Sequence, residues 1–540
     1  MFDFFKFLKG LPADKQAQTL DVSPESPGVK EQSWRSQKLR TSLKENLTTL
    51  HFILADCYDV VFREFDFAQL PDIRLALIYI DGLADKIQVS NFVMRSLSLE
   101  VPPALPKDYI ITKAQAFNFI RDRGLCIHQI KEADTLEVVI DAIMSGDTAL
   151  LVDGHDRAII NSARGWEARS IEDSKTEAVV RGPRESFVET LRTNTSLLRR
   201  RIKNPALKTE VMLIGKITRT DVAIAYIKGV VYPGLVAEVK ERLSRIEIDA
   251  VLESGYLEEL IDDNPLSPFC TINHTDRVDK VAAMLLEGRV AILTDGTPYV
   301  LTVPTLFNEI IQSPEDYYQR YFFYSLIRLI RIAALIIFLT APAAYVALLT
   351  FHQEMLPTSL LLSIAGQRDA VPFPTLVEVI IMDLTFEVLR EAGIRMPQPV
   401  GQAVSIVGAI VIGEASVRAG LVSPATVIVV ALTGIASFTL CYSGTLPLRL
   451  MKFPLTMIAA FSGLIGLICS LIILITHLAS LRSFGIPFLY PVMPLSPAEL
   501  KDVVVRAPWW ALLTRPHLLG KENLNRMKAG LKPKPPGERR

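Results

Sequence analysis

The sequence predicts an α/β soluble region with two similar α/β subdomains, followed by an all-α multi-span membrane domain. Up to Arg320, charged and apolar residues alternate as in soluble proteins, whereas from Ile332 to Ala498 charges are sparse and apolar runs are long. In addition, a pattern of short apolar runs that end at a glycine turn occurs twice, in the same order, before Arg320. The 58 basic and 58 acidic residues give a formal net charge of zero, which provides no electrostatic footprint for nucleic acid.

Residues 11–40 are polar and lack apolar periodicity, and we predict that residues 1–40 form a flexible leader. Its first ten residues have no long apolar core, so no signal peptide is predicted and we expect the soluble region to stay in the cytoplasm. The five cysteines show no paired spacing, which favours a reducing compartment. A helix is predicted from Thr41, because Leu43, Leu47 and Leu50 recur at helical spacing.

Four short apolar runs in the soluble region are typical of strands, and each ends at an Asp-Gly or Lys-Gly pair. The glycines are Gly82 and Gly154 and then Gly229 and Gly296, with offsets of 147 and 142 residues between corresponding members. Asp153-Gly154 and Asp295-Gly296 each stand between two apolar runs, which predicts hairpins. We therefore predict a duplicated α/β unit, although any α/β protein contains such runs. The boundaries are 41–204 for the first subdomain with a linker helix and 205–320 for the second.

The segment Arg181–Asn204 combines an apolar stripe with Arg199, Arg200 and Arg201. A phosphate or RNA site is conceivable, but no aromatic residues are interleaved for base stacking. A solvated or inter-subunit face is the preferred interpretation.

The membrane domain is predicted over 321–500, with four to six membrane segments. Ile332–Phe351 is twenty uncharged residues, enough to cross a core of about 30 Å, and Pro342 predicts a kink. Arg320, Arg328 and Arg331 precede this span, and the positive-inside bias then places the soluble region in the cytoplasm.

Three further spans and two less regular apolar segments follow. Met355–Gln367 is too short to span, and the proline-rich Phe484–Pro497 either re-enters the membrane or returns the chain to the cytoplasm. Arg449 and Lys452 are predicted in a cytoplasmic loop before the last span. The predicted spans are Met396–Gly420, Leu421–Leu440 and Phe453–Leu481.

The last segment, 501–540, has ten basic and three acidic residues, which predicts a basic cytoplasmic tail. Trp509 and Trp510 fit an anchor at the membrane surface.

Ionisable residues among the apolar runs are the candidate ion pathway, because such residues are costly in a membrane unless they face protein or water. Asp383, Glu387 and Glu391 fall within an arc of about 100° on one predicted helix, Phe373–Arg390 and its continuation. This helix either lines a pore mouth or lies at the interface with its charges in solvent. Glu414 and Arg418 are spaced to pair on one helical face, within the bilayer or at its rim. The candidates are Glu378, Asp383, Glu387, Glu391, Glu414 and Arg418.

Two stripes of small residues at four-residue spacing predict close helix packing. They are Ser405, Ala409 and Gly413, and Ser462, Gly466 and Ser470.

The chain contains no Walker A motif, no Rossmann glycine triplet, no HExxH and no GxSxG. We therefore predict no enzymatic activity, no catalytic residue, no cofactor and no metal site.

Several long segments of the chain resemble the spore germination GerA family, the A subunits of nutrient germinant receptors in spore-forming bacteria. They include RGPRESFVETLRTN (181–194), EGRVAILTDGTPYVLTVP (287–304), PFPTLVEVIIMDLTFEVLREAGIRMP (372–397) and GQAVSIVGAIVIGEASVRAGLVSP (401–424). The resemblance covers about residues 40–515. It implies a bipartite soluble domain joined to a multi-span domain, acting with a transporter-like B subunit and a lipoprotein C subunit in the spore inner membrane. It also implies an oligomeric, ligand-gated cation channel.

Three alternatives remain open at this point. The related stage V sporulation AF protein resembles the same segments and implies an accessory ion channel of spores. A secondary transporter, with the lipid bilayer as its only necessary partner, is a second possibility. A scaffold or sensor that binds a small molecule through its soluble region is the third.

Overall fold

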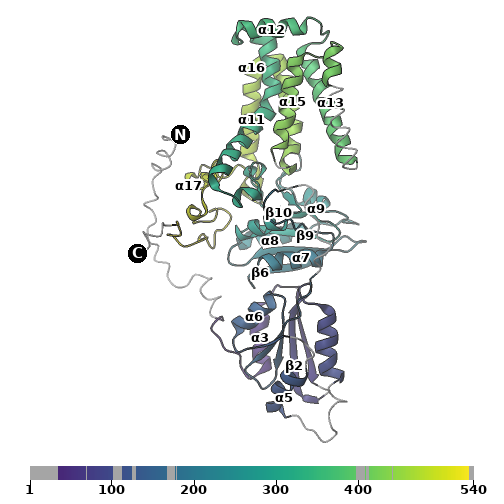
Figure 1. The fold of residues 1–540 in the computed structure, drawn as a ribbon, viewed down its shortest axis with the longest axis vertical. Helices are drawn as coiled ribbons and strands as arrows, with labels where there is room; N and C mark the ends of the chain where they lie inside the picture. The colour runs from purple at the N-terminus through teal and green to yellow at the C-terminus, as the bar shows by residue number, and fades with distance from the viewer. Residues whose placement is uncertain are drawn as a thin grey trace. The chain divides into compact units, whose positions relative to one another are not determined.

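The computed structural model describes residues 34–67, 70–100, 112–124, 129–166, 177, 179–396, 408, 413–440 and 442–533 (Figure 1). They form two compact units. The first ends at Trp166 and also takes in Lys203–Leu207, and the second comprises Glu167–Ile202 and everything from Lys208 onward.

The first unit is a five-stranded antiparallel sheet covered by helices on both faces, with strand order β1-β2-β4-β5-β3. Alternate residues of a strand face opposite sides of a sheet. Accordingly, Ala76 and Ile78 pack with α3 and α6, while Leu75 and Leu77 pack with η1 and α5. The elements are α3 (Leu43–Ile53), β1 (Val60–Phe67), β2 (Leu70–Ile80), η1 (Gln88–Glu100), α5 (Lys113–Phe119), η2 (Ile120–Gly124), β3 (Ile130–Ala133), α6 (Leu136–Met144), β4 (Thr148–Val152) and β5 (Ala158–Asn161).

The second unit begins with another five-stranded sheet of the corresponding order, β6-β7-β9-β10-β8. Helices α8 and α9 pack on its core cluster, and α7 and α10 contact each other and β9. The prediction of two similar α/β subdomains is thereby confirmed. The elements are α7 (Leu191–Arg201), β6 (Leu207–Ile214), β7 (Thr220–Ile227), α8 (Pro233–Ser244), α9 (Ser254–Ile261), β8 (Asn273–Thr275), α10 (Val278–Leu286), β9 (Val290–Thr294) and β10 (Val300–Val303).

The Asp-Gly pairs have a role beyond the hairpin turn. The Asp153 carboxylate accepts a hydrogen bond from the backbone N–H of Leu43 (3.4 Å), and the Asp295 carboxylate accepts one from Leu191 (2.9 Å). Leu43 and Leu191 are the first residues of α3 and α7, where free N–H groups favour a negative charge. The same cap thus occurs in both subdomains, which supports the duplication at the level of single hydrogen bonds.

The predicted hairpins at Asp153-Gly154 and Asp295-Gly296 are confirmed by the antiparallel pairs β4–β5 and β9–β10. Their glycines adopt φ values of 89° and 87°, which favour glycine. After Gly82 and Gly229, by contrast, the chain enters the helices η1 and α8. Strands β1, β3, β6 and β8 were not predicted.

Replacing Asp295 by alanine removes the only side chain that caps α7 in the described residues, since Thr190 makes no capping bond. We expect a loss of about 1 kcal/mol of local stability, the usual cost of a lost cap. The check is faster amide hydrogen exchange in α7 of the full-length protein. The control is Glu247→Ala, which removes an exposed charge and should change exchange little.

Helix α7 differs from the predicted solvated basic face. The Arg199 guanidinium is fully buried and donates to the Thr209 hydroxyl (3.2 Å). Arg200 and Arg201 both pair with Glu185 (2.9 and 2.7 Å). Since its cap comes from Asp295, α7 is part of the second subdomain in this structure rather than a linker from the first.

In the described part of the chain, the helices α11, α12, α13, α15 and α16 follow the second sheet, and α11, α13, α15 and α16 lie side by side (Figure 1). Among the described residues, α11 and Gly444–Ser480 of α16 are long and apolar enough to cross a membrane. Their outward faces carry exposed Ile336, Phe461 and Ile473. Most of the predicted span Met396–Gly420 falls outside the described residues. The helices are α11 (Tyr321–Phe351), α12 (Thr358–Arg368), α13 (Thr375–Arg395), α15 (Pro424–Phe438) and α16 (Tyr442–Ser480).

Helix α16 corrects two expectations. It begins at Tyr442 rather than Phe453, so Arg449 and Lys452 lie on a helix instead of a cytoplasmic loop. It also breaks at Gly463 (φ 64°, ψ −152°), where an added Cβ would lie 2.6 Å from the His352 ring. The break therefore occurs where the end of α11 packs directly against α16.

The chain after α16 returns to the second subdomain. Phe484 joins the apolar core of the second sheet, and the buried Ser483 hydroxyl donates to the carbonyl of Thr271 (2.6 Å). The segment Phe484–Pro497 was expected either to re-enter the membrane or to return the chain to the cytoplasm. These contacts agree with a return to the soluble region and not with a re-entrant segment. The elements are β11 (Arg482–Ser483), β12 (Ile486–Pro487), α17 (Pro497–Leu500) and η6 (Trp509–Ala511).

Candidate functional site

Glu378 lies on α13 with its side chain fully buried. Its carboxylate accepts hydrogen bonds from the backbone N–H and hydroxyl of Ser423 (2.9 and 2.8 Å) and from the hydroxyl of Thr426 (3.0 Å). Ser423 is the N-cap of α15, so the negative charge meets the positive end of that helix. Arg368 of α12 lies 3.4 Å from the other carboxylate oxygen. Glu378 thus links α13 to α15 by hydrogen bonds and to α12 by an ion pair.

Asp383 is buried one and a half turns further along α13. Its carboxylate lies 3.0 Å from the Lys452 ammonium of α16, which is itself only 2% exposed. The Lys452 ammonium also lies 5.8 Å from the centre of the Phe338 ring of α11. A buried charge requires a partner of opposite sign, and here Asp383 and Lys452 are each other's partners.

Glu387 lies between two arginines. The guanidinium of Arg390, on the same helix, is 3.3 Å away, and that of Arg449 on α16 is 3.4 Å away. Arg390 also donates to the Ser437 hydroxyl of α15 (2.6 Å) and stacks over the Phe438 ring at 5.0 Å. Together with Asp383 and Lys452, these residues form a cluster of ion pairs between α13, α15 and α16.

The remaining candidates lie on the surface of the described structure. Glu391 pairs with Arg395 (2.7 Å) and Glu414 pairs with Arg418 (2.5 Å), each with both side chains largely exposed. The spacing of Glu414 and Arg418 had suggested their pairing. The structure brings together Asp383 and Glu387, and leaves Glu391 and the Glu414–Arg418 pair apart from them.

The small-residue stripes are only partly described, because Ser405 and Ala409 lie outside the described residues. Gly413 is described, and an added Cβ there would lie 4.0 Å from Val427 of α15. On α16, Ser462 precedes the break at Gly463, and Gly466 and Ser470 follow it. The three heavy atoms nearest to a Cβ added at Gly466 belong to Ser462 and Ile458 of α16 itself.

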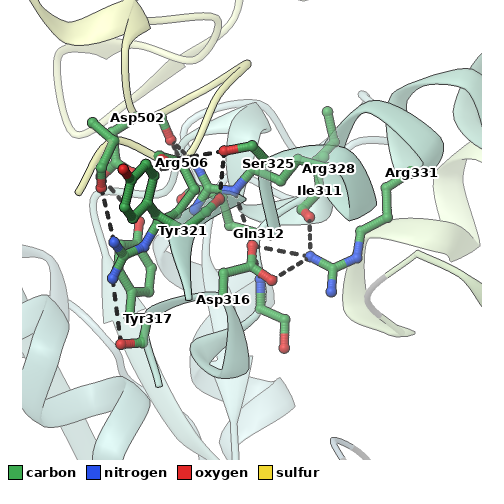
Figure 2. Close-up of polar contacts among 12 residues, drawn as sticks. Ile311, Gln312, Asp316, Tyr317, Tyr321, Ser325, Arg328, Arg331, Asp502 and Arg506 are labelled. Atoms are coloured by element: carbon green, nitrogen blue, oxygen red, sulfur yellow. Dashed lines mark hydrogen bonds and ion pairs between the residues drawn. The ribbon is translucent and has the colours of Figure 1, made fainter. Parts of the chain in front are cut away.

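A second buried charged cluster lies at the base of α11, and the sequence did not predict it (Figure 2). We name it the junction, and its members are Asp316, Tyr317, Arg328, Arg331, Asp502 and Arg506. Asp316 and Arg328 are both fully buried.

Asp316 is the acceptor at the centre of the junction. It receives the Nε–H of Arg328 (2.9 Å) and a guanidinium N–H of Arg331 (2.8 Å). Arg328 also reaches the tail, where it donates to the backbone carbonyl of Asp502 and lies 3.2 Å from its carboxylate. One arginine of the first long apolar helix therefore joins the end of the second subdomain to the tail.

The tail side of the junction is held by Tyr317 and Arg506. The Tyr317 hydroxyl donates to the Asp502 carboxylate (3.0 Å), and burial raises the pKa of this phenol, as does the nearby Asp502 charge. Burial also raises the pKa of the Asp502 carboxyl, while Arg328 opposes that rise. Arg506 is 2% exposed and stacks on the Tyr317 ring at 5.5 Å, and burial lowers its pKa.

Three residues named from the sequence acquire partners here. Arg328 and Arg331, which precede the first predicted span, both pair with Asp316. The Trp509 indole N–H donates to the carbonyl of Tyr317 (3.2 Å), and its anchoring at the membrane surface stays a prediction. Among the described residues, no three His, Cys, Asp or Glu side chains gather as metal ligands.

Comparison with known proteins decides the family. The family model described as Bacillus/Clostridium GerA spore germination protein matches residues 48–518. The chain belongs to this GerA family.

The GerA relatives include three curated proteins of similar length. Spore germination protein KA of Bacillus subtilis (strain 168) is 45% identical over 92% of this chain and 90% of its own length. Spore germination protein GerLA of Bacillus cereus is 39% identical over 89% of this chain and 96% of its own. Spore germination protein B1 of Bacillus subtilis (strain 168) is 40% identical over 89% of this chain and 97% of its own length. The resemblance stated from the sequence is confirmed, and it supports a role in spore germination.

One solved structure is similar to part of the chain. It is the crystal structure of the N-terminal domain of the A subunit of the Bacillus megaterium spore germinant receptor GerK3. The match has 34% sequence identity and a TM-score of 0.39, and it covers 50% of this chain and 97% of that one.

Proposed function

We propose that this GerA-family chain is the membrane subunit of a spore nutrient germinant receptor, and that several copies assemble around a cation pathway that opens when a nutrient binds. Its partners in this proposal are a transporter-like B subunit and a lipoprotein C subunit. Its place is the spore inner membrane, crossed several times, with the soluble region in the cytoplasm. The GerA relatives, which are described as spore germination proteins, support a role in spore germination.

The observation that carries the channel proposal is the buried cluster of ion pairs on α13. Ionisable residues within apolar helices are expensive and tend to mark ion or proton pathways. Cation channels commonly use rings of carboxylates to attract ions, and several copies of Asp383 and Glu387 around an axis would form such rings. In this structure both carboxylates are occupied by Lys452, Arg449 and Arg390. We assign that paired arrangement to the closed state.

Opening requires that cations compete with the basic partners for these carboxylates. A passing cation gains little from a carboxylate that already has an ammonium at 3.0 Å. A relative shift of α13 and α16 would separate the pairs and expose the carboxylates to water. Nutrient binding would favour this shift if the nutrient binds the open arrangement more tightly.

The test is ion flux through vesicles that contain the full-length chain with its B and C partners. Exchanging both acids for amides, Asp383→Asn with Glu387→Gln, should reduce cation conductance or cation-over-anion selectivity, because amides keep the shape and lose the charge. Glu354→Gln, at an exposed position before α12, is the matched control. Permeation equal to wild type in the double variant would remove both residues from the pathway.

A secondary transporter is favoured by one observation, the break of α16 at Gly463. Transporters often place substrate sites at such interruptions of membrane helices. Saturable, gradient-coupled uptake by the chain without partners would support this second candidate, whereas conductance that rises linearly with concentration would support the channel.

A further inference from the structure

The second unit contains a cavity of about 420 Å³ that neither the ion-pair cluster nor the proposed pathway uses. It lies between α10, the segment from Glu309 to Tyr318, and the tail. Its size is within the range of small-molecule binding sites.

The tail forms one wall of this cavity through specific contacts with the end of α10. The Arg515 Nε–H donates to the carbonyl of Leu286 (2.7 Å), and Arg526 pairs with Glu287 (2.8 Å). Gly288 follows α10 with φ 96°, and an added Cβ would lie 2.8 Å from the carbonyl oxygen of Leu519. The tail is therefore fitted against this turn, and the cavity is complete only when the tail is docked.

Most of the cavity wall is apolar. Its lining includes Met284 and Leu286 of α10 together with Tyr317, Trp509 and Met527. Flat aromatic surfaces and flexible methionines suit an apolar or aromatic ligand body.

Two basic groups in the wall lack a full set of partners. Arg515 donates to the carbonyls of Leu286, Asn523 and Asn525, and no carboxylate of the described residues lies within ion-pair distance of it. The Nε of Arg289 is buried and has no acceptor among the described residues, although this side chain pairs with Glu309. Burial and the neighbouring Arg526 lower the pKa of Arg515, as expected where positive charge is in excess.

We propose that this cavity binds a small amphipathic carboxylate, with its apolar body against Trp509, Tyr317 and Met284 and its carboxylate on Arg515. The Nε–H and Nη1 donors of Arg515 are engaged by carbonyls, and its Nη2 group has no acceptor among the described residues, so this charged donor is suited to a ligand carboxylate. The cavity shares Tyr317 with the junction, and Gln312 of the cavity wall donates to the carbonyl of the junction residue Asp502 (2.9 Å). A ligand that fills the cavity therefore stabilises the docked tail by mass action.

The test measures binding to the full-length protein in lipid nanodiscs by calorimetry, with indole-3-propionate as the probe and indole-3-propionamide as its uncharged match. This measurement is independent of ion flux, so it can fail while the channel proposal stands. We expect saturable binding of the carboxylate, and about tenfold weaker binding of the amide, since a charged hydrogen bond is lost.

Three variants locate the site. Ala283→Phe extends an exposed α10 side chain into the cavity and should abolish binding of both probes. Arg515→Gln should weaken the carboxylate about tenfold more than the amide, because the amide is affected only through the lost docking contact with Leu286. Lys521→Gln removes a charge from the same tail outside the cavity and should change neither affinity. Met527→Trp fills the cavity from the tail side and replaces Ala283→Phe if that variant does not fold.

Three results would overturn the proposal. The first is no saturable binding of the carboxylate to the wild-type protein. The second is equal affinity for the carboxylate and the amide. The third is binding that survives a folded cavity-filling variant, which would mean that the probe partitions into lipid or binds elsewhere.

Discussion

Replacing Lys452 by methionine is expected to destabilise the helical part of the chain by about 3 to 5 kcal/mol, the usual cost of leaving one member of a buried ion pair without its partner. Asp383 would remain buried among α13 and α16, at 3% exposure, with its nearest cation gone. Arg390 and Arg449 are already engaged by Glu387 and do not pair with Asp383 in this structure. The measurement is denaturant-induced unfolding of the full-length protein in detergent, followed by helix content.

The double variant Asp383→Asn with Lys452→Met separates the loss of pairing from the loss of packing. It removes both charges, and we expect it to recover most of the lost stability. Arg395→Met is the matched control, because it removes the partner of Glu391 in an exposed pair and should cost less than about 1 kcal/mol. If Lys452→Met were no less stable than Arg395→Met, the Asp383–Lys452 pair would not stabilise this bundle.

The second large effect is expected at the junction. Replacing Arg328 by methionine should release the tail, because this fully buried arginine is the residue that bonds both Asp316 and Asp502. We expect a local loss of about 3 to 5 kcal/mol, as for other broken buried pairs. Trypsin should then cleave after Arg506 and Arg526 much sooner than in the wild-type protein.

Arg320→Met is the control for this experiment, since Arg320 is exposed at the start of α11 and should leave the tail protected. Arg328→Lys keeps the charge but lacks the forked geometry that reaches both carboxylates, so we expect intermediate cleavage. Tail cleavage in Arg328→Met at the wild-type rate would contradict the role assigned to the junction.

The sequence predicted those parts of the fold that depend on local patterns. The strands that end at Gly154 and Gly296, their hairpins and the helix α13 all follow from spacing within one element. The short strand β8 and the polar edge strand β6 carry weaker apolar patterns, which explains why they were missed.

Of the candidate site, the sequence predicted the acidic residues but not their partners. Glu378, Asp383 and Glu387 stood out because acids are rare in apolar helices, but their partners Ser423 and Lys452 lie far along the chain. Spacing cannot predict such pairs, since they depend on how separate helices pack. The predicted last span began at Phe453, and this placed Lys452 in a loop, whereas the helix runs through both Pro447 and Pro454.

The junction was missed for a related reason. Asp316, Arg328 and Asp502 come from three separate segments, and the tail was judged by its average charge rather than by single residues. Arg506, one of the ten basic residues of that tail, is 2% exposed.

Because Phe484 lies in the core of the second sheet and Leu519 packs on Leu306, the helices α11 to α16 interrupt a domain whose last pieces are made after those helices. The domain therefore cannot close until the ribosome has synthesised all of them. A ribosome stalled before residue 484 would display a half-built domain.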